Sequence, residues 1–229
     1  MKKRVQHVFL GVVVGSGICI GGILLLSRFA GNNHEMLYQG RPSSYWLEQI
    51  NSSDTTASNR AILVLNLQII PRLIDQMAHD TNDSHFRMEL VERLNGLPGV
   101  STYYSPAFYR RRDAAYELAE FGPAANAAIP ELIKTVKGHA AYSRYLAIIV
   151  LGSIHGDPDE VIPLLLPYLN DDDTGQAAAA AMGNYGHLAR AALPKMIPLL
   201  SAGDRDLRDT VRQALKNIDP EAANQAGVR

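Results

Sequence analysis

The second half of the chain repeats one segment at a nearly constant interval, and this periodicity constrains the fold more than any other feature. One apolar position recurs at intervals of 33, 31 and 33 residues, at Leu118, Leu151, Met182 and Leu215. A second recurs at the same intervals three residues later, at Phe121, Ile154, Tyr185 and Ile218. A fixed period in this range is typical of proteins that stack one supersecondary unit. The sequence therefore predicts an array of similar units, whose broad role is to present a binding surface.

Composition indicates that the repeated unit is helical. Of the 229 residues, 47% are hydrophobic and 20% are charged, which is a globular balance. Alanine runs such as 177–181, together with only 7% aromatic residues, favour closely packed helices over sheets. The predicted class is all-α. The formal net charge of -1 argues against a nucleic-acid partner, whose phosphates would require many Lys and Arg contacts.

Residues 8–26 form an uncharged apolar run, VFLGVVVGSGICIGGILLL, preceded by Lys2, Lys3 and Arg4. At about 1.5 Å per residue this run spans a hydrocarbon core of roughly 30 Å. A cleaved signal peptide is the alternative, but its apolar region is usually shorter, and residues 27–31 offer no Ala-x-Ala-like site. We therefore predict a single N-terminal transmembrane helix at 8–26.

The basic residues before the span predict its orientation. Residues 1–7 should stay in the cytoplasm, and the body should lie on the extracytoplasmic side of the cell membrane behind a tether at 27–41. Glycines in the span, among them Gly11 and Gly15, have the small-xxx-small spacing that lets two spans pack in weak self-association. Glycine is also simply common in membrane spans, and both interpretations stay open.

The body begins with a helix near Pro42. Apolar spacing then predicts helices at 57–67, 69–77 and 86–94, so that two helix pairs precede residue 95. Residues 95–106 contain two glycines and two prolines and break this rhythm. A helix at 108–121 opens the regular part.

Two sequence patterns in the regular part carry a family resemblance. GPAANAAIPEL at 122–132 precedes a polar turn and a helix of the form Arg-x-x-Ala-x-x-x-Leu-Gly-x-Ile. Arg111, Arg144 and Arg208 occupy the Arg position, which is Gly175 in the third copy. The Gly position holds Gly152 and Gly183, but alanine and lysine elsewhere. This phrasing resembles HEAT repeats, particularly the bacterial type also seen in phycobilisome-lyase-like proteins, and the segment 38–47 looks like the start of membrane-anchored bacterial HEAT proteins.

The resemblance implies an α-solenoid of about five to six antiparallel helix pairs, in which the second helices line a concave surface for protein partners. The solenoid is expected over residues 42–220, most clearly over 108–220, with 221–229 as a C-terminal tail.

The segment 103–112, YYSPAFYRRR, combines four aromatic residues with three arginines at the irregular connection. Tyr and Arg supply rigid, amphipathic contact area at protein interfaces. We therefore predict partner-binding residues Tyr103, Tyr104, Phe108, Tyr109, Arg110 and Arg112. Arg111 occupies the repeat's Arg position and is expected to be structural. The alternative interpretation is that the aromatic residues fill a gap in the core and the arginines are solvated.

No sequence pattern indicates catalysis, a cofactor or a metal. NDDD at 170–173 is interpreted as a turn with a helix cap, because a calcium loop would place Glu where Met182 stands. The histidines lack partners at ligand spacing, phosphate loops and Gly-x-Ser-x-Gly motifs are missing, and no paired carboxylates are set in a recognisable cleft. The favoured function is a membrane-anchored, non-catalytic HEAT-repeat scaffold for a protein partner. The alternative is a HEAT-like enzyme of the lyase or DNA-glycosylase kind.

Overall fold

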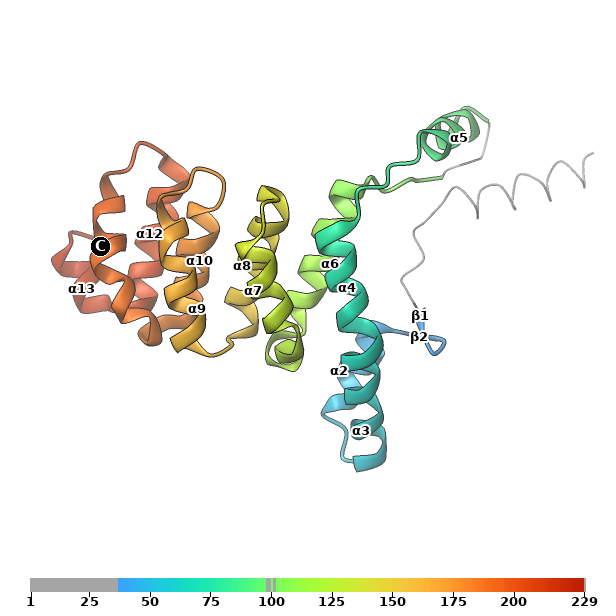
Figure 1. Ribbon diagram of the computed structural model, residues 1–229, viewed down its shortest axis with the longest axis horizontal. Helices are drawn as coiled ribbons and strands as arrows, with labels where there is room; N and C mark the ends of the chain where they lie inside the picture. The colour runs from blue at the N-terminus through green and yellow to red at the C-terminus, as the bar shows by residue number, and fades with distance from the viewer. Residues whose placement is uncertain (1–36, 98–99, 101, 229) are drawn as a thin grey trace, which may run out of the picture. The chain divides into compact units, whose positions relative to one another are not determined.

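The computed structural model describes residues 37–97, 100 and 102–228. Helices dominate these residues, and the described strands are the two short ones of a single sheet, β1 (Leu37–Tyr38) and β2 (Arg41–Pro42). The predicted all-α class is confirmed (Figure 1). The predicted transmembrane segment 8–26, with its glycines and the cytoplasmic residues 1–7, lies outside the described residues.

The described residues divide into two compact units. We call residues 81–107 the inserted unit, and residues 38–80 together with 108–228 the main unit. The inserted unit contains α5 (His85–Asn95). The main unit holds every other described helix, except that α6 (Ala107–Glu120) begins one residue before it.

The main unit begins at Tyr38, inside the segment 27–41 that was expected to be a tether. Tyr38 is buried, and its carbonyl oxygen accepts a hydrogen bond of 2.9 Å from Trp46 Nε1 in α2 (Ser43–Ile50). The residues from Tyr38 onward therefore belong to the packed body. At the other end, α13 (Pro220–Gln225) packs on α12 and Val228 is buried, so the body extends through most of the expected C-terminal tail.

The expected separate helices at 57–67 and 69–77 are one continuous helix, and the predicted break between them is wrong. The helix comprises α3 (Thr55–Val64), the π-helical segment η1 (Leu65–Ile69) and α4 (Ile70–His79). The Ile70 N–H donates to the Leu65 carbonyl, five residues back. A π turn is frequently a local insertion in an α-helix, and here it directly precedes Pro71, which lacks an N–H and would otherwise crowd the preceding turn.

Residues 55–79 also form a helix long and apolar enough to cross a membrane, the one such helix among the described residues. This assignment rests on length and composition alone, and 44% of its most apolar stretch is buried. Leu65, Ile69, Ile70 and Leu73 are among its fully buried side chains. A core helix of a soluble body passes the same test, so the finding is weak evidence for a span.

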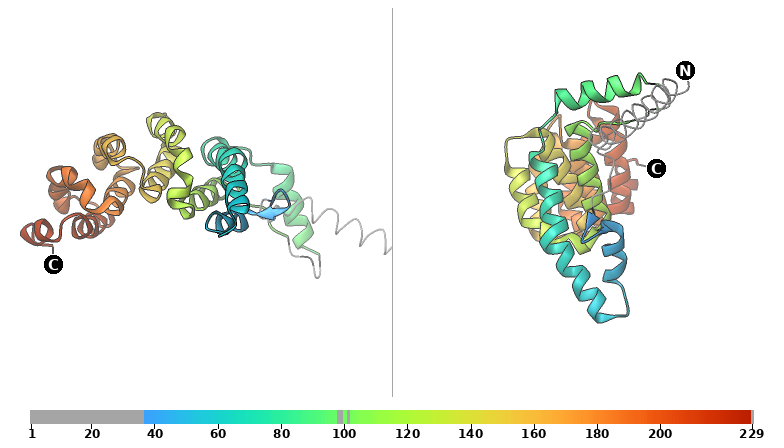
Figure 2. Two further views of the ribbon diagram at one scale, coloured as in Figure 1. Left: turned by 90° about the horizontal axis from the view of Figure 1, so that it is seen from below. Right: turned by 90° about the vertical axis from the view of Figure 1, so that its right-hand side faces the viewer.

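The regular part follows the predicted periodicity. Its remaining elements are η2 (Gly122–Ala128), α7 (Ile129–Lys137), α8 (Ala141–Ile154), α9 (Pro158–Leu165), η3 (Leu166–Asn170), α10 (Gly175–Tyr185), η4 (Gly186–Ala192), α11 (Leu193–Met196), η5 (Ile197–Ser201) and α12 (Arg205–Ile218). The four copied segments lie in α6, α8, α10 and α12. Within the main unit α7 packs on α8, α8 on α10 and α10 on α12 (Figure 2).

The recurring apolar positions form the core of the main unit. Every residue at the first position is fully buried, and those at the second are at most 5% exposed. The periodicity found in the sequence is thus the periodicity of the core. Gly152 and Gly183 allow the long helices to approach closely, because a Cβ at Gly152 would lie 2.7 Å from Ala181 Cα and one at Gly183 would lie 2.9 Å from Ala214 Cα.

Each arginine of the repeat lies on the second helix of a pair and caps the C-terminus of the first helix of that pair. Arg144 donates to the carbonyl oxygens of Val136 and Gly138 at 3.0 and 2.6 Å, at the end of α7. Arg208 likewise donates to two carbonyl oxygens just beyond η5, at 2.6 and 2.9 Å. These carbonyls have no partner within their own helix, and a cation there also complements the helix dipole.

Arg111 makes the same bond to α4. Its Nε donates to the Met77 carbonyl at 2.9 Å, so α4 is the partner of α6. Residues 80–106 therefore connect the two helices of this pair, as residues 138–140 connect α7 and α8 in the next pair. The expectation that 69–77 and 86–94 form a pair is therefore wrong. An amphipathic segment at 86–94 satisfies the helical pattern equally well whether it is a repeat helix or part of an insertion, and α5 is the latter.

Candidate protein-binding surface

Exposed aromatic side chains on α6 gather beside half-buried ones on α8, both in the main unit. We define the aromatic surface as Phe108, Tyr109, Arg112, Tyr116, Tyr142 and Tyr145. The 33-residue period explains why these residues meet. Tyr142 and Tyr145 in α8 correspond to Tyr109 and Arg112 in α6, and residues three or four apart share one helix face.

The rings form a connected arrangement across the two helices. Phe108 stacks on Tyr142 with ring centroids 4.6 Å apart and an interplanar angle of 18°. Tyr142 and Tyr145 are nearly parallel at 6.3 Å, and Phe108 meets Tyr109 edge to face at 5.4 Å. Phe108, Tyr109 and Tyr116 are 52%, 42% and 49% exposed. Such geometries stabilise a group of rings while leaving much of their area open to solvent.

Arg112 adds a cation to this surface. Its guanidinium carbon lies 5.0 Å from the Tyr109 ring centroid and 5.9 Å from that of Tyr116. It also pairs with Asp113 at 3.1 Å, and this hydrogen bond raises the pKa of Arg112, so the side chain stays charged. Burial likewise raises the pKa of the half-buried Tyr142, although the neighbouring arginines oppose that effect. The surface therefore presents neutral phenols around a permanent cation.

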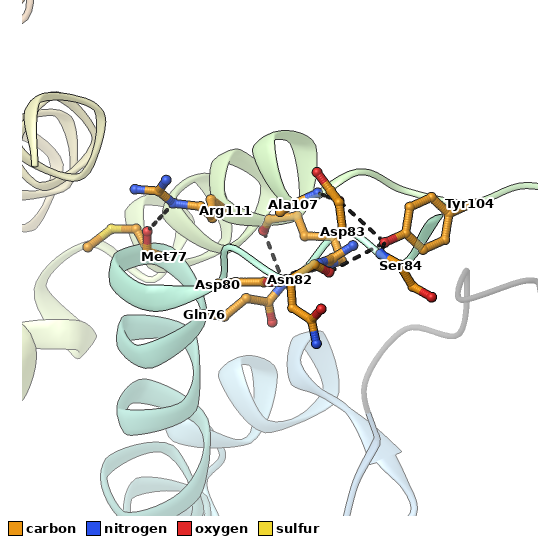
Figure 3. Close-up of polar contacts among 10 residues, drawn as sticks. Gln76, Met77, Asp80, Asn82, Asp83, Ser84, Tyr104, Ala107 and Arg111 are labelled. Atoms are coloured by element: carbon orange, nitrogen blue, oxygen red, sulfur yellow. Dashed lines mark hydrogen bonds and ion pairs between the residues drawn. The ribbon is translucent and has the colours of Figure 1, made fainter. Parts of the chain in front are cut away.

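A hydrogen-bond network beneath the aromatic surface fixes the two helices that carry it. Arg111 donates to the Met77 carbonyl, as Figure 3 shows, and also to Ser143 Oγ at 2.6 Å. The buried Ser143 hydroxyl donates in turn to the Ala78 carbonyl at 3.1 Å. The Arg111 guanidinium also lies 4.9 Å from the Tyr142 ring centroid. Arg111 thus joins α4, α6 and α8, which is the structural role expected for it.

Arg110 is bound within the main unit. It forms two hydrogen bonds of 2.7 Å to the Asp80 carboxylate, and both side chains are less than one-fifth exposed. The Gln76 side chain donates to the Arg110 carbonyl at 3.0 Å. These contacts fix the start of α6 to the end of α4. The predicted partner contact through Arg110 would have to displace a bidentate ion pair.

Tyr103 and Tyr104 belong to the inserted unit and differ in exposure. Tyr104 is buried, and its hydroxyl accepts from the Ser84 N–H at 3.0 Å and lies 3.3 Å from Asp83 Oδ1. The same Asp83 oxygen accepts from the Ala107 N–H at 2.6 Å (Figure 3). Tyr104 therefore joins the two ends of the inserted unit. Tyr103, in contrast, is 49% exposed.

Tyr103 lines a groove of about 540 Å³ in the inserted unit. Met88 and Val91 of α5 form its apolar side, together with Pro106. The Asn95 side chain closes one end of the groove by bonding to Thr102, donating to its carbonyl at 2.9 Å and accepting from its N–H at 2.7 Å.

A second concavity, of about 650 Å³, lies at the C-terminal ends of α8, α10 and α12. Its lining includes Ser153, His155, Asn184 and Asn217. His155 has a positive φ of 57°, at the repeat position where Gly122 and Gly186 stand. Its ring nitrogens lie 2.9 Å from the Ser153 and Asn184 carbonyl oxygens. These hydrogen bonds explain why a residue other than glycine occupies this left-handed backbone conformation, which favours glycine.

The segment 170–173 forms the expected turn, but the predicted cap is not made, because the side chain of Thr174, the N-cap residue of α10, accepts no hydrogen bond from the helix. Asp171 Oδ1 accepts from the N–H groups of Asp173 and Thr174 and from the Thr174 hydroxyl, at 2.7 to 3.1 Å. These bonds, above all that from the hydroxyl, lower the pKa of Asp171. Within the described ranges no group of three or more His, Cys, Asp or Glu side chains is placed to hold a metal ion.

Sequence reasoning missed half of the aromatic surface. Tyr116, Tyr142 and Tyr145 lie outside the segment 103–112, although the 33-residue register would have aligned Tyr142 with Tyr109. No protein-family model matches the chain, and no curated protein matches it. The functional argument therefore rests on the geometry of this chain.

Proposed function

We propose that this protein is a membrane-anchored, non-catalytic scaffold, whose main unit is an α-solenoid of HEAT-like helix pairs, and that it binds a protein partner through the aromatic surface. The succession of packed helices α7, α8, α10 and α12 supports the solenoid. Two recurring devices support it further, namely the arginine cap between the helices of a pair and the glycine contact between successive pairs. Both are repeated at the sequence period, as expected of one stacked unit.

The aromatic surface is the observation that carries the binding proposal. Tyrosine, phenylalanine and arginine are enriched in protein interfaces, and tyrosine and arginine dominate their energetic hot spots. Exposed rings fixed by stacking and by the Arg111 network lose little conformational freedom on binding, and this lowers the entropic cost of association. These rings lie on α6 and α8, the second helices of their pairs. In a HEAT-like array the second helices would line the concave face.

The proposal of a membrane anchor is supported by the uncharged apolar sequence of residues 8–26 and by the basic residues before it. Under this proposal the scaffold holds its partner at the extracytoplasmic surface of the cell membrane. A protease added to intact cells should remove the body but leave residues 1–7 protected. Protection of the body until the membrane is permeabilised would contradict the orientation.

The binding proposal is tested by quantitative affinity purification of the full chain from detergent extracts. The wild type is compared with Tyr109→Ala/Arg112→Ala, which removes the centre of the surface, and with Leu188→Ala. Leu188 is 52% exposed on η4, away from that surface, and serves as a matched control. We expect one partner at near-stoichiometric yield with the wild type and the control, reduced at least tenfold with the double variant. The same proteins at the same yield from all three chains would refute the proposal.

A further inference from the structure

We propose that the aromatic surface takes a proline-rich segment in the polyproline II conformation, and this inference rests on the proposed function because it specifies the partner of that surface. The first argument is area. A Phe or Tyr side chain buries about 150–250 Å² when fully covered, so three rings about half exposed, with the less exposed Tyr142 and Tyr145 beside them, offer on the order of 300–400 Å². A stable interface between folded proteins needs about 800 Å² on each side. The surface therefore fits a short linear segment better than a folded partner or a second copy of the chain.

The second argument is the balance of charge and hydrogen-bonding groups. α8 carries no acidic side chain, and Arg144, its only basic residue, is bound to the carbonyls of Val136 and Gly138. α6 does carry acidic residues, and the one next to Arg112, Asp113, forms an ion pair with it. The exposed donors beside the rings are tyrosine hydroxyls and those guanidinium N–H groups of Arg112 that the Asp113 carboxylate does not bind. A proline-rich segment has few N–H groups and leaves its carbonyl oxygens unpaired, so it matches a surface of donors.

The third argument is shape and rigidity. Polyproline II segments dock on aromatic side chains because the proline rings pack against the ring faces, and the ligand is already extended. Here the rings of Phe108, Tyr142 and Tyr145 lie within 18° of parallel between neighbours. Arg111 and Ser143 fix the backbones beneath them. Both partners are therefore ordered before they meet, which reduces the cost of binding.

Fluorescence polarisation tests the inference, with the full chain in detergent and fluorescein-labelled decaproline as the probe. A (Gly-Ser)5 peptide with the same label is the control ligand. We expect saturable binding of decaproline, at least tenfold weaker binding of the Gly-Ser peptide, and a loss of at least tenfold in decaproline affinity for Tyr109→Ala and Tyr145→Ala. Tyr109→Phe keeps the ring but removes one donor, so it should lose less affinity than Tyr109→Ala, whereas Leu188→Ala should lose none. Circular dichroism checks that each variant remains folded.

Three outcomes would overturn the inference. The first is no binding of decaproline, and the second is equal binding of both peptides. The third is a wild type that sediments as a dimer while Tyr109→Ala is a monomer, because a second copy would then cover the surface. If partner capture depends on Tyr109 while decaproline does not bind, the scaffold proposal stands and the polyproline inference fails. If decaproline binds through these rings but no partner is captured, the scaffold proposal fails.

Discussion

Replacing Gly152 with alanine tests whether the close approach of α8 and α10 stabilises the main unit. The new Cβ would lie 2.7 Å from both Cα and Cβ of Ala181, about 1 Å inside ordinary contact. Because the Cα belongs to the backbone of α10, it cannot move aside like the end of a flexible side chain. The two helices must separate, and fully buried side chains near the contact in sequence, namely Ile148, Leu151 and Met182, are expected to lose part of their packing.

The magnitude follows from dispersion energies. A buried side chain of this size makes about 40–60 contacts of roughly 0.1–0.2 kcal/mol, and a gap of 0.5–1 Å forfeits a quarter or more of each contact across it. If about half the contacts face the other helix, the loss is ~1 kcal/mol for each of the three side chains, or ~3 kcal/mol in all. Alanine recovers ~1 kcal/mol through its higher helix propensity. We expect a net destabilisation of ~2 kcal/mol.

The assay is urea unfolding of the full chain, followed by far-ultraviolet circular dichroism. Gly203→Ala is the matched control, because no atom lies within 4 Å of its Cβ position and its φ is not positive. The control should unfold at or slightly above the wild-type urea concentration, whereas Gly152→Ala should unfold at a clearly lower one. Equal midpoints for the two variants would refute the packing argument.

Three further predictions concern single contacts. Arg144→Ala should lower the free energy of unfolding by ~1–2 kcal/mol in the same assay, because the carbonyls at the end of α7, including that of Gly138, lose their charged donor. Burial raises the pKa of Tyr185 to about 12, above the unfolded value of about 10, so stability that is present below pH 10 should be lost as the pH rises to 12. Tyr185→Phe should flatten this dependence in alkaline unfolding, and an unchanged alkaline profile would contradict it. Tyr104→Phe should speed hydrogen exchange at the Ser84 amide by about tenfold while the exchange of α8 stays unchanged, and the opposite pattern would count against its role in the inserted unit.

The regular half of the fold could be predicted because each copied segment carries its own core residues. The repeat period and the helical pattern are sufficient to assign apolar positions such as Leu118 and Leu151 to the core, where both are fully buried. The first half could not be predicted in the same way. Whether α5 belongs to a repeat depends on which helix Arg111 caps, and that contact joins residues 34 positions apart in the chain.

The candidate site was predicted in part for a related reason. A contiguous segment drew attention to Phe108, Tyr109 and Arg112, and these residues are exposed on the aromatic surface. The same segment also contains Tyr104 and Arg110, whose hydrogen bonds hold the local structure. Composition alone cannot separate the two groups, because the difference is made by Ser84 and Asp80, which lie twenty and thirty residues before Tyr104 and Arg110.

The bond from Arg111 to the end of α4 makes the connection between α4 and α6 a natural grafting position. The Arg111 side chain bonds α6 to the end of α4, so the segment that connects these two helices contributes little to how they pack. Residues 80–106 number 27, where the next pair uses three at 138–140, and a loop lengthened about ninefold costs only ~2 kcal/mol in closure entropy. A repeat array built in this way could gain or exchange a whole module at that point while its core remained intact.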